Sequence, residues 1–151
     1  MPIFIYTHLE SYIRDLYKTL SINNPRQLDI EKIASMLNIN VYYGASNYRV
    51  GNNVILKKST KPREWQMFAH ELCHCLRHVG NQLNMHYLFV DLQEYQADHF
   101  AYHFCVPTFM LANLREVSVD IITRLFNVEY DFALRRLEMY QSKILSKGVH
   151  A

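Results

Sequence analysis

The five residues His70-Glu-Leu-Cys-His74 include the residue types that metal-dependent hydrolysis needs. In a helix, residues four apart share a face with their Cβ atoms ~5–6 Å apart, so two imidazoles there can bind one zinc ion. Glu71 follows His70 by about 100° of helical rotation and lies beside the ion, where it can take a proton from water that zinc has acidified. The spacing predicts a zinc site with Glu71 as general base. The alternative is three polar residues on a half-buried helix.

A catalytic zinc ion takes three protein ligands and keeps a fourth position open, so another donor is required. Glu94 and Asp98 lie four residues apart on the next predicted helix, and nineteen residues separate Glu94 from His74, enough for a loop and a returning helix. We predict that Glu94 is the third ligand and that Asp98 accepts a hydrogen bond from the outer N–H of His70. The alternative for Glu94 is a capping role, because Asp91-x-x-Glu94 also resembles a helix start.

Several neighbouring side chains could also belong to a site, although packing is the favoured interpretation for them. His78 continues the four-residue spacing, but it is predicted to end the helix and donate to one of the last carbonyls. Cys73 and Cys75 flank His74 on different faces and are predicted to be packed thiols. A group that stabilises the oxyanion could come from the second helix. The candidates there are His99, Tyr102 and His103.

Caps and periodicity predict the elements that must position these residues. Helices are expected over residues 8–20, 29–37, 60–78 and 91–105. Their start signals are Thr7 with Glu10, Asp29, and Ser59 or Thr60. Alternating apolar residues predict three strands, over residues 39–43, 48–50 and 54–56. We expect residues 54–57 to form an exposed edge to which a substrate peptide could add.

The C-terminal part of the chain predicts two more helices joined by a tight connection. Residues 118–126 and 129–142 have helical apolar spacing, with Asn127-Val128 between them, and the arrangement resembles a helix-turn-helix. We therefore expect an α+β fold, mostly helical and zincin-like, with a small antiparallel or mixed sheet of about three strands. Residues 1–110 would form a metallopeptidase core, and residues 111–151 a helical segment packed on it.

Composition limits the classes of function. The chain of 151 residues has a formal net charge of +2, which is too mild to indicate nucleic-acid binding by itself. Its three cysteines, an odd number, favour free thiols in a reducing compartment over a disulfide framework. The N-terminus lacks the apolar length of a signal peptide, and no run approaches the ~20 apolar residues of a membrane span. We expect a cytoplasmic protein without a membrane partner.

Longer segments resemble a known family. The segments His70-Glu-Leu-Cys-His-Cys-Leu-Arg-His78, Glu94-Tyr-Gln-Ala-Asp-His-Phe-Ala101 and Cys105-Val-Pro107 are together similar to the ImmA/IrrE metallopeptidases, and the resemblance spans residues 25–140. It implies a gluzincin-like core with zinc on His70, His74 and Glu94 and with Glu71 as the base. Two positions depart from the family pattern: Cys73 stands where Gly is usual, and Gln96 where Glu is frequent.

The resemblance also implies a biological role. Several family members carried on phages and integrative elements cleave a helix-turn-helix repressor and so derepress the element. We therefore expect a zinc-dependent endopeptidase that acts on a cytosolic regulatory protein, a helix-turn-helix repressor of a phage or mobile element. The alternative is a zinc-stabilised regulator that binds protein or DNA without proteolysis. DNA binding by the C-terminal segment would use Arg124, Arg135 and Arg136, but a solvated helical face is the default interpretation.

Overall fold

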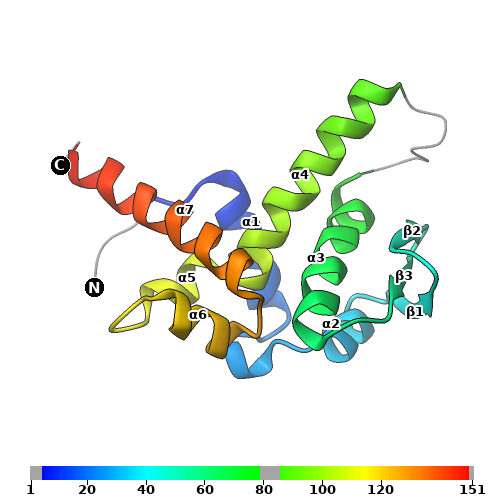
Figure 1. Ribbon diagram of the computed structural model, residues 1–151, viewed down its shortest axis with the longest axis horizontal. Helices are drawn as coiled ribbons and strands as arrows, with labels where there is room; N and C mark the ends of the chain where they lie inside the picture. The colour runs from blue at the N-terminus through cyan, green and yellow to red at the C-terminus, as the bar shows by residue number, and fades with distance from the viewer. Residues whose placement is uncertain (1–4, 79–85, 150–151) are drawn as a thin grey trace.

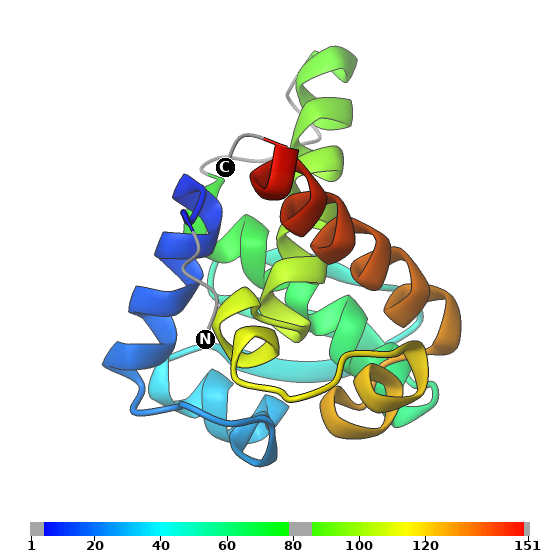
Figure 2. The same cartoon turned by 90° about the vertical axis from the view of Figure 1, so that its left-hand side faces the viewer.

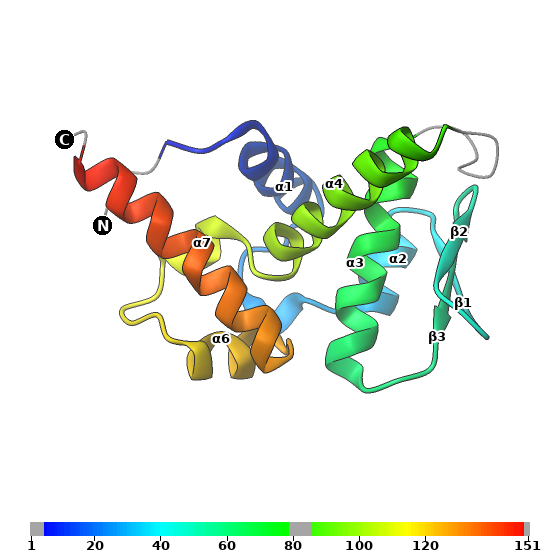
Figure 3. The same ribbon diagram turned by 45° about the horizontal axis from the view of Figure 1, so that its top comes forward.

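A central helix organises the structure. The computed structural model describes residues 5–78 and 86–149, with side chains of the last helix described as far as Leu145. Helix α3 (Lys61–Arg77) has a small sheet against one face and helix α4 (Tyr87–Cys105) against another (Figure 1). Helix α1 (His8–Thr19) packs on α4, and helices α6 (Val119–Phe126) and α7 (Tyr130–Val149) lie on the side away from the sheet (Figure 3).

The remaining elements complete the predicted α+β, mostly helical class. They are a 3₁₀ turn η1 (Pro25–Gln27), helix α2 (Ile30–Met36), strands β1 (Asn40–Gly44), β2 (Tyr48–Val50) and β3 (Asn53–Lys57), and helix α5 (Thr108–Ala112). No helix among the described residues is both long enough and apolar enough to cross a membrane.

Local capping starts helices α1, α2 and α3 where the sequence predicts. Thr7 and Glu10 form a capping box, with each side chain accepting the other's backbone N–H, at 2.9 and 3.1 Å. Asp29 caps α2 by accepting from the backbone of Lys32 at 3.2 Å. Thr60, rather than Ser59, caps α3. Satisfying these first N–H groups fixes where each helix begins.

The sheet order differs from the prediction. β3 is the central strand, parallel to β1 and antiparallel to β2, so the three-stranded sheet is mixed. All of residues 54–57 pair with β1, and Val54 and Ile55 also pair with β2, so the predicted exposed edge at this strand is wrong. The prediction failed because β2 and β3 form a hairpin, and β1 then adds to the far side of β3. Val54 and Leu56 are buried, and both belong to the hydrophobic core.

Helix α4 begins earlier than predicted. It starts at Tyr87, where His86 accepts the backbone N–H of Leu88 through its side chain, a cap outside the usual Ser, Thr, Asp and Asn set. Asp91 thus lies inside the helix, so the alternative that Asp91 and Glu94 mark a helix start is wrong. Figure 2 shows the first turns of α4 rising above the body of the molecule. Gly80 and the first part of the predicted loop, residues 81–85, lie outside the described residues.

Aromatic side chains fill the core between α1, α3 and α4. Tyr17 donates its hydroxyl to the backbone oxygen of Phe104 at 2.6 Å, and the two rings stack with their centroids 4.9 Å apart. Trp65 and Phe100 also contact Phe104, at centroid distances of 5.5 and 5.4 Å. These contacts hold α4 at a fixed height against α3, which sets the positions of the polar residues further along both helices.

The two C-terminal helices pack on the core through both polar and apolar contacts. Asn127 ends α6 in the left-handed conformation, with φ of 54°. Gln66 on α3 donates to the Glu129 carboxylate at 3.0 Å and accepts the Glu129 backbone N–H at 2.7 Å. Helix α7 continues beyond the predicted end at residue 142, to Val149. Arg136 is 1% exposed, so its predicted place on a solvated cationic face is wrong.

Candidate metal centre

Helices α3 and α4 bring together the three residues that the sequence predicts as metal ligands. One donor atom from each of His70, His74 and Glu94 lies within 4.8 Å of the other two. The Glu94 carboxylate is 2.6 Å from His70 Nε2 and 3.5 Å from His74 Nε2. Two imidazoles and one carboxylate are a donor set that catalytic zinc uses.

The environment of His74 tests whether these residues suit a metal ion. The side chain is 5% exposed, and its Nε2 has no hydrogen-bond partner among the described residues. A buried nitrogen without a partner costs free energy unless it binds something. Burial also lowers the pKa of His74, which keeps the imidazole neutral, and the neutral form is the one that binds metals. The donor set therefore fits a zinc-like cation.

His70 is held between two carboxylates. Its Nε2 faces Glu94, and its Nδ1 lies 2.7 Å from Asp98 Oδ1, one helical turn further along α4. With Asp98 ionised, that contact requires a proton on Nδ1, which leaves the lone pair on Nε2 directed at the donor cluster. The predicted contact between Asp98 and His70 is thus present. The four-residue spacing places Glu94 and Asp98 on one face of α4, so that both carboxylates reach the ring of His70.

Glu71 lies next to the donor cluster and is 7% exposed. Burial raises the pKa of its carboxyl to about 7, and the neighbouring Glu94 carboxylate adds to the rise, while His70 and Arg49 oppose it. A pKa near neutral suits a group that must accept and release a proton at physiological pH. Glu71 has the burial and pKa expected of a general base.

Two polar residues near the cluster were not singled out as site residues from the sequence. Gln96 on α4 contacts His78, with Oε1 2.9 Å from Nε2, and His78 Nδ1 in turn lies 2.9 Å from Nδ1 of His74. The predicted role of the His78 side chain as donor to a helix carbonyl is therefore wrong. Arg49 on β2 donates to the His78 backbone oxygen at 3.0 Å. His74 and His78 are four residues apart, but no local sequence signal indicates the contacts of His78 with Gln96 and Arg49, because these depend on how α4 and β2 pack against α3.

The other candidates pack locally. Burial raises the pKa of Cys73 to about 12 and that of Cys75 to about 11, so both are neutral thiols. The Tyr102 ring stacks on Phe132 of α7, with centroids 4.4 Å apart. His103 is buried, and its Nδ1 lies 3.0 Å from the backbone oxygen of His99. These contacts favour the packing interpretation for all of them.

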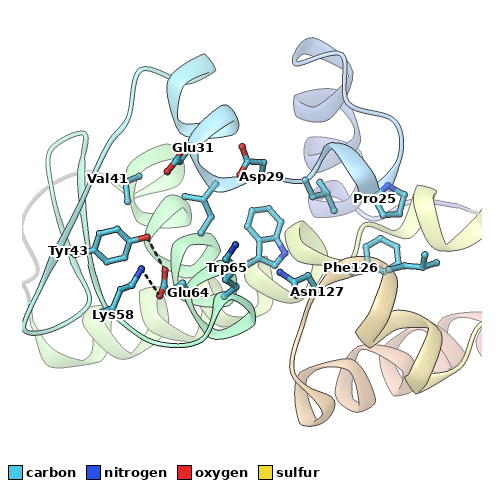
Figure 4. A pocket seen from close by; sticks show the side chains of 14 residues that line it. Pro25, Asp29, Glu31, Val41, Tyr43, Lys58, Glu64, Trp65, Phe126 and Asn127 are labelled. Carbon is cyan, nitrogen blue, oxygen red and sulfur yellow. Dashed lines mark hydrogen bonds and ion pairs between the residues drawn. The ribbon is translucent and has the colours of Figure 1, made fainter.

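A cavity of about 330 Å³ lies apart from the metal centre, between α2, β1, the start of α3 and the end of α6. Figure 4 shows Tyr43 and Lys58 converging on Glu64 at its wall. Tyr43 donates to Glu64 at 2.9 Å, as does the backbone N–H of Ser59. These groups hold the strand-to-helix connection before α3, and the lining residues do not include the predicted ligands.

Comparisons with known proteins decide the family. A family model described as the IrrE N-terminal-like domain matches residues 26–138, which is most of the chain. The chain belongs to the IrrE N-terminal-like peptidase family. It is 39% identical over 148 residues to the phage-like element PBSX protein XkdA of Bacillus subtilis strain 168, covering 91% of this chain and 75% of that protein. It is 32% identical over 149 residues to the uncharacterized protein YqaB of the same strain, covering 91% of this chain and 87% of YqaB.

These findings confirm the predicted resemblance. Membership of this family supports a metallopeptidase-like role, and a peptidase family implies a protein substrate.

Proposed function

We propose that this protein is a zinc-dependent endopeptidase that cleaves a cytosolic regulatory protein, a helix-turn-helix repressor of a phage or mobile element. One observation carries the proposal: the donor atoms of His70, His74 and Glu94 meet between two helices, beside the buried carboxyl of Glu71. The phage-element relative supports the choice of substrate, because derepression of such an element requires loss of its repressor.

The residues divide the work as follows. His70, His74 and Glu94 would hold a zinc ion, which would supply the Lewis acidity that polarises a peptide carbonyl and acidifies water. Glu71 takes the proton from the attacking water and passes it to the leaving amine. The Asp98 carboxylate lies 2.7 Å from His70 Nδ1 and keeps His70 in the tautomer that has its lone pair on Nε2. Burial of Glu71 and His74 limits competing water and strengthens each of these interactions.

We also propose that residues 1–110 form the metallopeptidase core and that residues 111–151 form a segment fixed to it. The reciprocal bonds between Gln66 and Glu129 and the stacking of Tyr102 on Phe132 support a rigid attachment. A rigidly attached pair of helices would give a folded repressor a surface to dock on beside the metallopeptidase core.

The test pairs the purified, zinc-loaded chain with the helix-turn-helix repressor encoded beside its gene. Mass spectrometry should find one defined pair of fragments. Glu71→Gln should reduce the rate by about 10²-fold or more, because the general base is lost, while bound zinc stays at one ion per chain. Glu31→Gln, which removes an exposed carboxylate on α2, outside both the donor cluster and residues 111–151, serves as the matched control and should cleave normally. Equal inactivation of the repressor by Glu71→Gln without fragments would instead support a non-proteolytic regulator.

A further inference from the structure

The two histidines of the candidate metal centre have different partners on their outer nitrogens. His70 Nδ1 contacts the Asp98 carboxylate at 2.7 Å. His74 Nδ1 instead contacts a second imidazole, that of His78, at 2.9 Å between the two Nδ1 atoms. His78 then contacts Gln96 Oε1 on α4 through Nε2, at 2.9 Å. A chain of three side chains therefore runs from Gln96 through His78 to His74.

Counting the protons restricts which of these three side chains can donate and which can accept. Two neutral imidazole nitrogens in contact share one proton, so either His74 donates to His78 or His78 donates to His74. If Gln96 accepts from His78 Nε2–H, then His78 Nδ1 carries the lone pair and His74 Nδ1 donates to it. His74 Nε2 then has a free lone pair. If His78 instead donates to His74 Nδ1, the proton of neutral His74 lies on Nε2, which prevents that nitrogen from binding a metal ion.

We propose that Gln96 and His78 are positioning residues that fix the tautomer of His74. The amide oxygen of Gln96 selects the direction of the chain, and the Nε2 lone pair of His74 then faces Glu94 and His70. This inference rests on the proposed zinc site, and it assigns to His78, oriented by Gln96, the role that Asp98 has on the other histidine. The described contacts leave buried His74 Nε2 without a hydrogen-bond partner, as a metal ligand requires.

Backbone contacts keep His78 in place for this role. His78 is the residue at which α3 ends, and its N–H still donates to the backbone oxygen of His74 at 3.2 Å. Arg49 on β2 donates through Nη2 to the backbone oxygen of His78 at 3.0 Å. The sheet and the helix thus both hold the His78 backbone, which fixes the position from which its ring reaches His74 and Gln96.

Asp98 and Gln96 differ in one chemical respect that makes the inference testable. An ionised Asp98 can only accept a hydrogen bond, whereas the amide of Gln96 can accept through oxygen or donate through nitrogen. Gln96→Met removes the acceptor and keeps the length of the side chain. Gln96→Glu offers only acceptors and so allows only the productive direction. Tyr95→Phe, at the exposed neighbouring position on the same helix, is the matched control.

The experiment measures zinc affinity of the full chain by competition with a chromophoric chelator. Gln96→Met should bind zinc about tenfold more weakly than the unchanged chain, the lower end of the range for direct partners of ligand histidines, because Gln96 acts on His74 through His78. Gln96→Glu should bind at least as tightly, and Tyr95→Phe should be unchanged. Nitrogen-15 NMR of the zinc-free chain should show His74 protonated on Nδ1, with the opposite tautomer populated in Gln96→Met.

The outcomes separate this inference from the proposed function. If the unchanged chain binds zinc and Gln96→Met matches it in affinity and in the tautomer of His74, the positioning role is wrong and the zinc site stands. If the unchanged chain does not bind zinc, the proposed function fails and the positioning role fails with it.

Discussion

Two of the buried polar clusters that the described residues form differ in whether their groups have hydrogen-bond partners. The cluster that joins α1, α5 and α7 is closed. Glu10 accepts from the Thr7 backbone and from Lys143, both at 2.9 Å, and from the Thr108 hydroxyl. Arg136 donates to Thr108 and to the Val106 backbone oxygen, both at 2.9 Å. Each group named here has a partner that belongs to the protein.

The cluster between α3 and α4 is open by comparison. Its carboxylates converge on imidazoles, and the buried Nε2 of His74 has no hydrogen-bond partner among the described residues. A closed network stabilises the fold, because each buried polar group recovers the hydrogen bonds that it had with water. An open cluster costs stability and is kept where a ligand completes it. The comparison predicts that changes in the closed cluster alter stability alone and changes in the open cluster alter metal binding.

The largest expected effect is on the closed cluster. Arg136→Met should lower the free energy of unfolding by about 3–5 kcal/mol, because it leaves the Thr108 hydroxyl and the buried Val106 oxygen short of a donor and removes the positive charge that attracts Glu10. Urea unfolding measures this. Arg135→Met removes a neighbouring guanidinium whose pair with Glu138, at 3.4 Å, is exposed, so it should cost less than about 1 kcal/mol. Equal losses in the two variants would contradict the distinction.

The second largest expected effect is a loss of stability when acid protonates Glu10 in the closed cluster. Burial alone would raise the pKa of Glu10, but hydrogen bonds from Thr108, Thr7 and Lys143 lower it from 4.5 to about 2. A carboxyl with a lowered pKa stabilises the fold above its unfolded pKa, and that stability is lost as pH falls through the folded pKa. We expect a loss on the order of 3 kcal/mol between about pH 5 and pH 2. Glu10→Gln should lack this part of the pH dependence in urea unfolding; an unchanged slope would contradict it.

Zinc should stabilise the open cluster. A ligand that binds only the folded state adds about 2.7 kcal/mol to the free energy of unfolding when its free concentration is 100 times Kd. Unfolding with and without zinc measures the difference. Glu94→Gln keeps the shape of the side chain but removes the charge, so it should abolish most of the zinc effect. A similar zinc effect in Glu94→Gln would show that the ion binds elsewhere.

The same contrast explains how much the sequence could predict. Local rules found the capping box of Thr7 and Glu10, the cap at Asp29 and the shared faces of His70 with His74 and of Glu94 with Asp98, because each depends on residues within one helix. The family resemblance further predicted that the two faces meet.

Features that depend on packing between elements could not be predicted. Besides capping α1, Glu10 contacts Thr108 and Lys143, which are 98 and 133 positions further along the sequence. The burial of Arg136 depends on how α7 docks. The contact of His78 with Gln96 depends on the offset of α4 along α3, and the central place of β3 depends on which side of a hairpin the first strand joins. None of these leaves a pattern in the local sequence.

The smallest expected effect concerns His70, one of the two histidines proposed as ligands. Asp98→Asn keeps the size of the side chain and leaves an amide oxygen facing His70 Nδ1, but removes the charge that strengthens the bond at 2.7 Å. Because the Asp98 side chain is largely exposed, water weakens this contact, and we expect the lower end of the usual range, a zinc affinity about tenfold weaker, or about 1.4 kcal/mol.

Chelator competition measures this affinity, and urea unfolding without zinc should be unchanged because the bond is exposed. A loss of zinc-free stability as large as that of Arg136→Met would place Asp98 in a stabilising network and end the distinction between the two clusters. A tenfold loss of affinity at constant stability would instead show that an exposed carboxylate acts on the metal site through His70 alone. In that case the fold tolerates the open cluster because the closed one supplies the stability that the metal centre lacks.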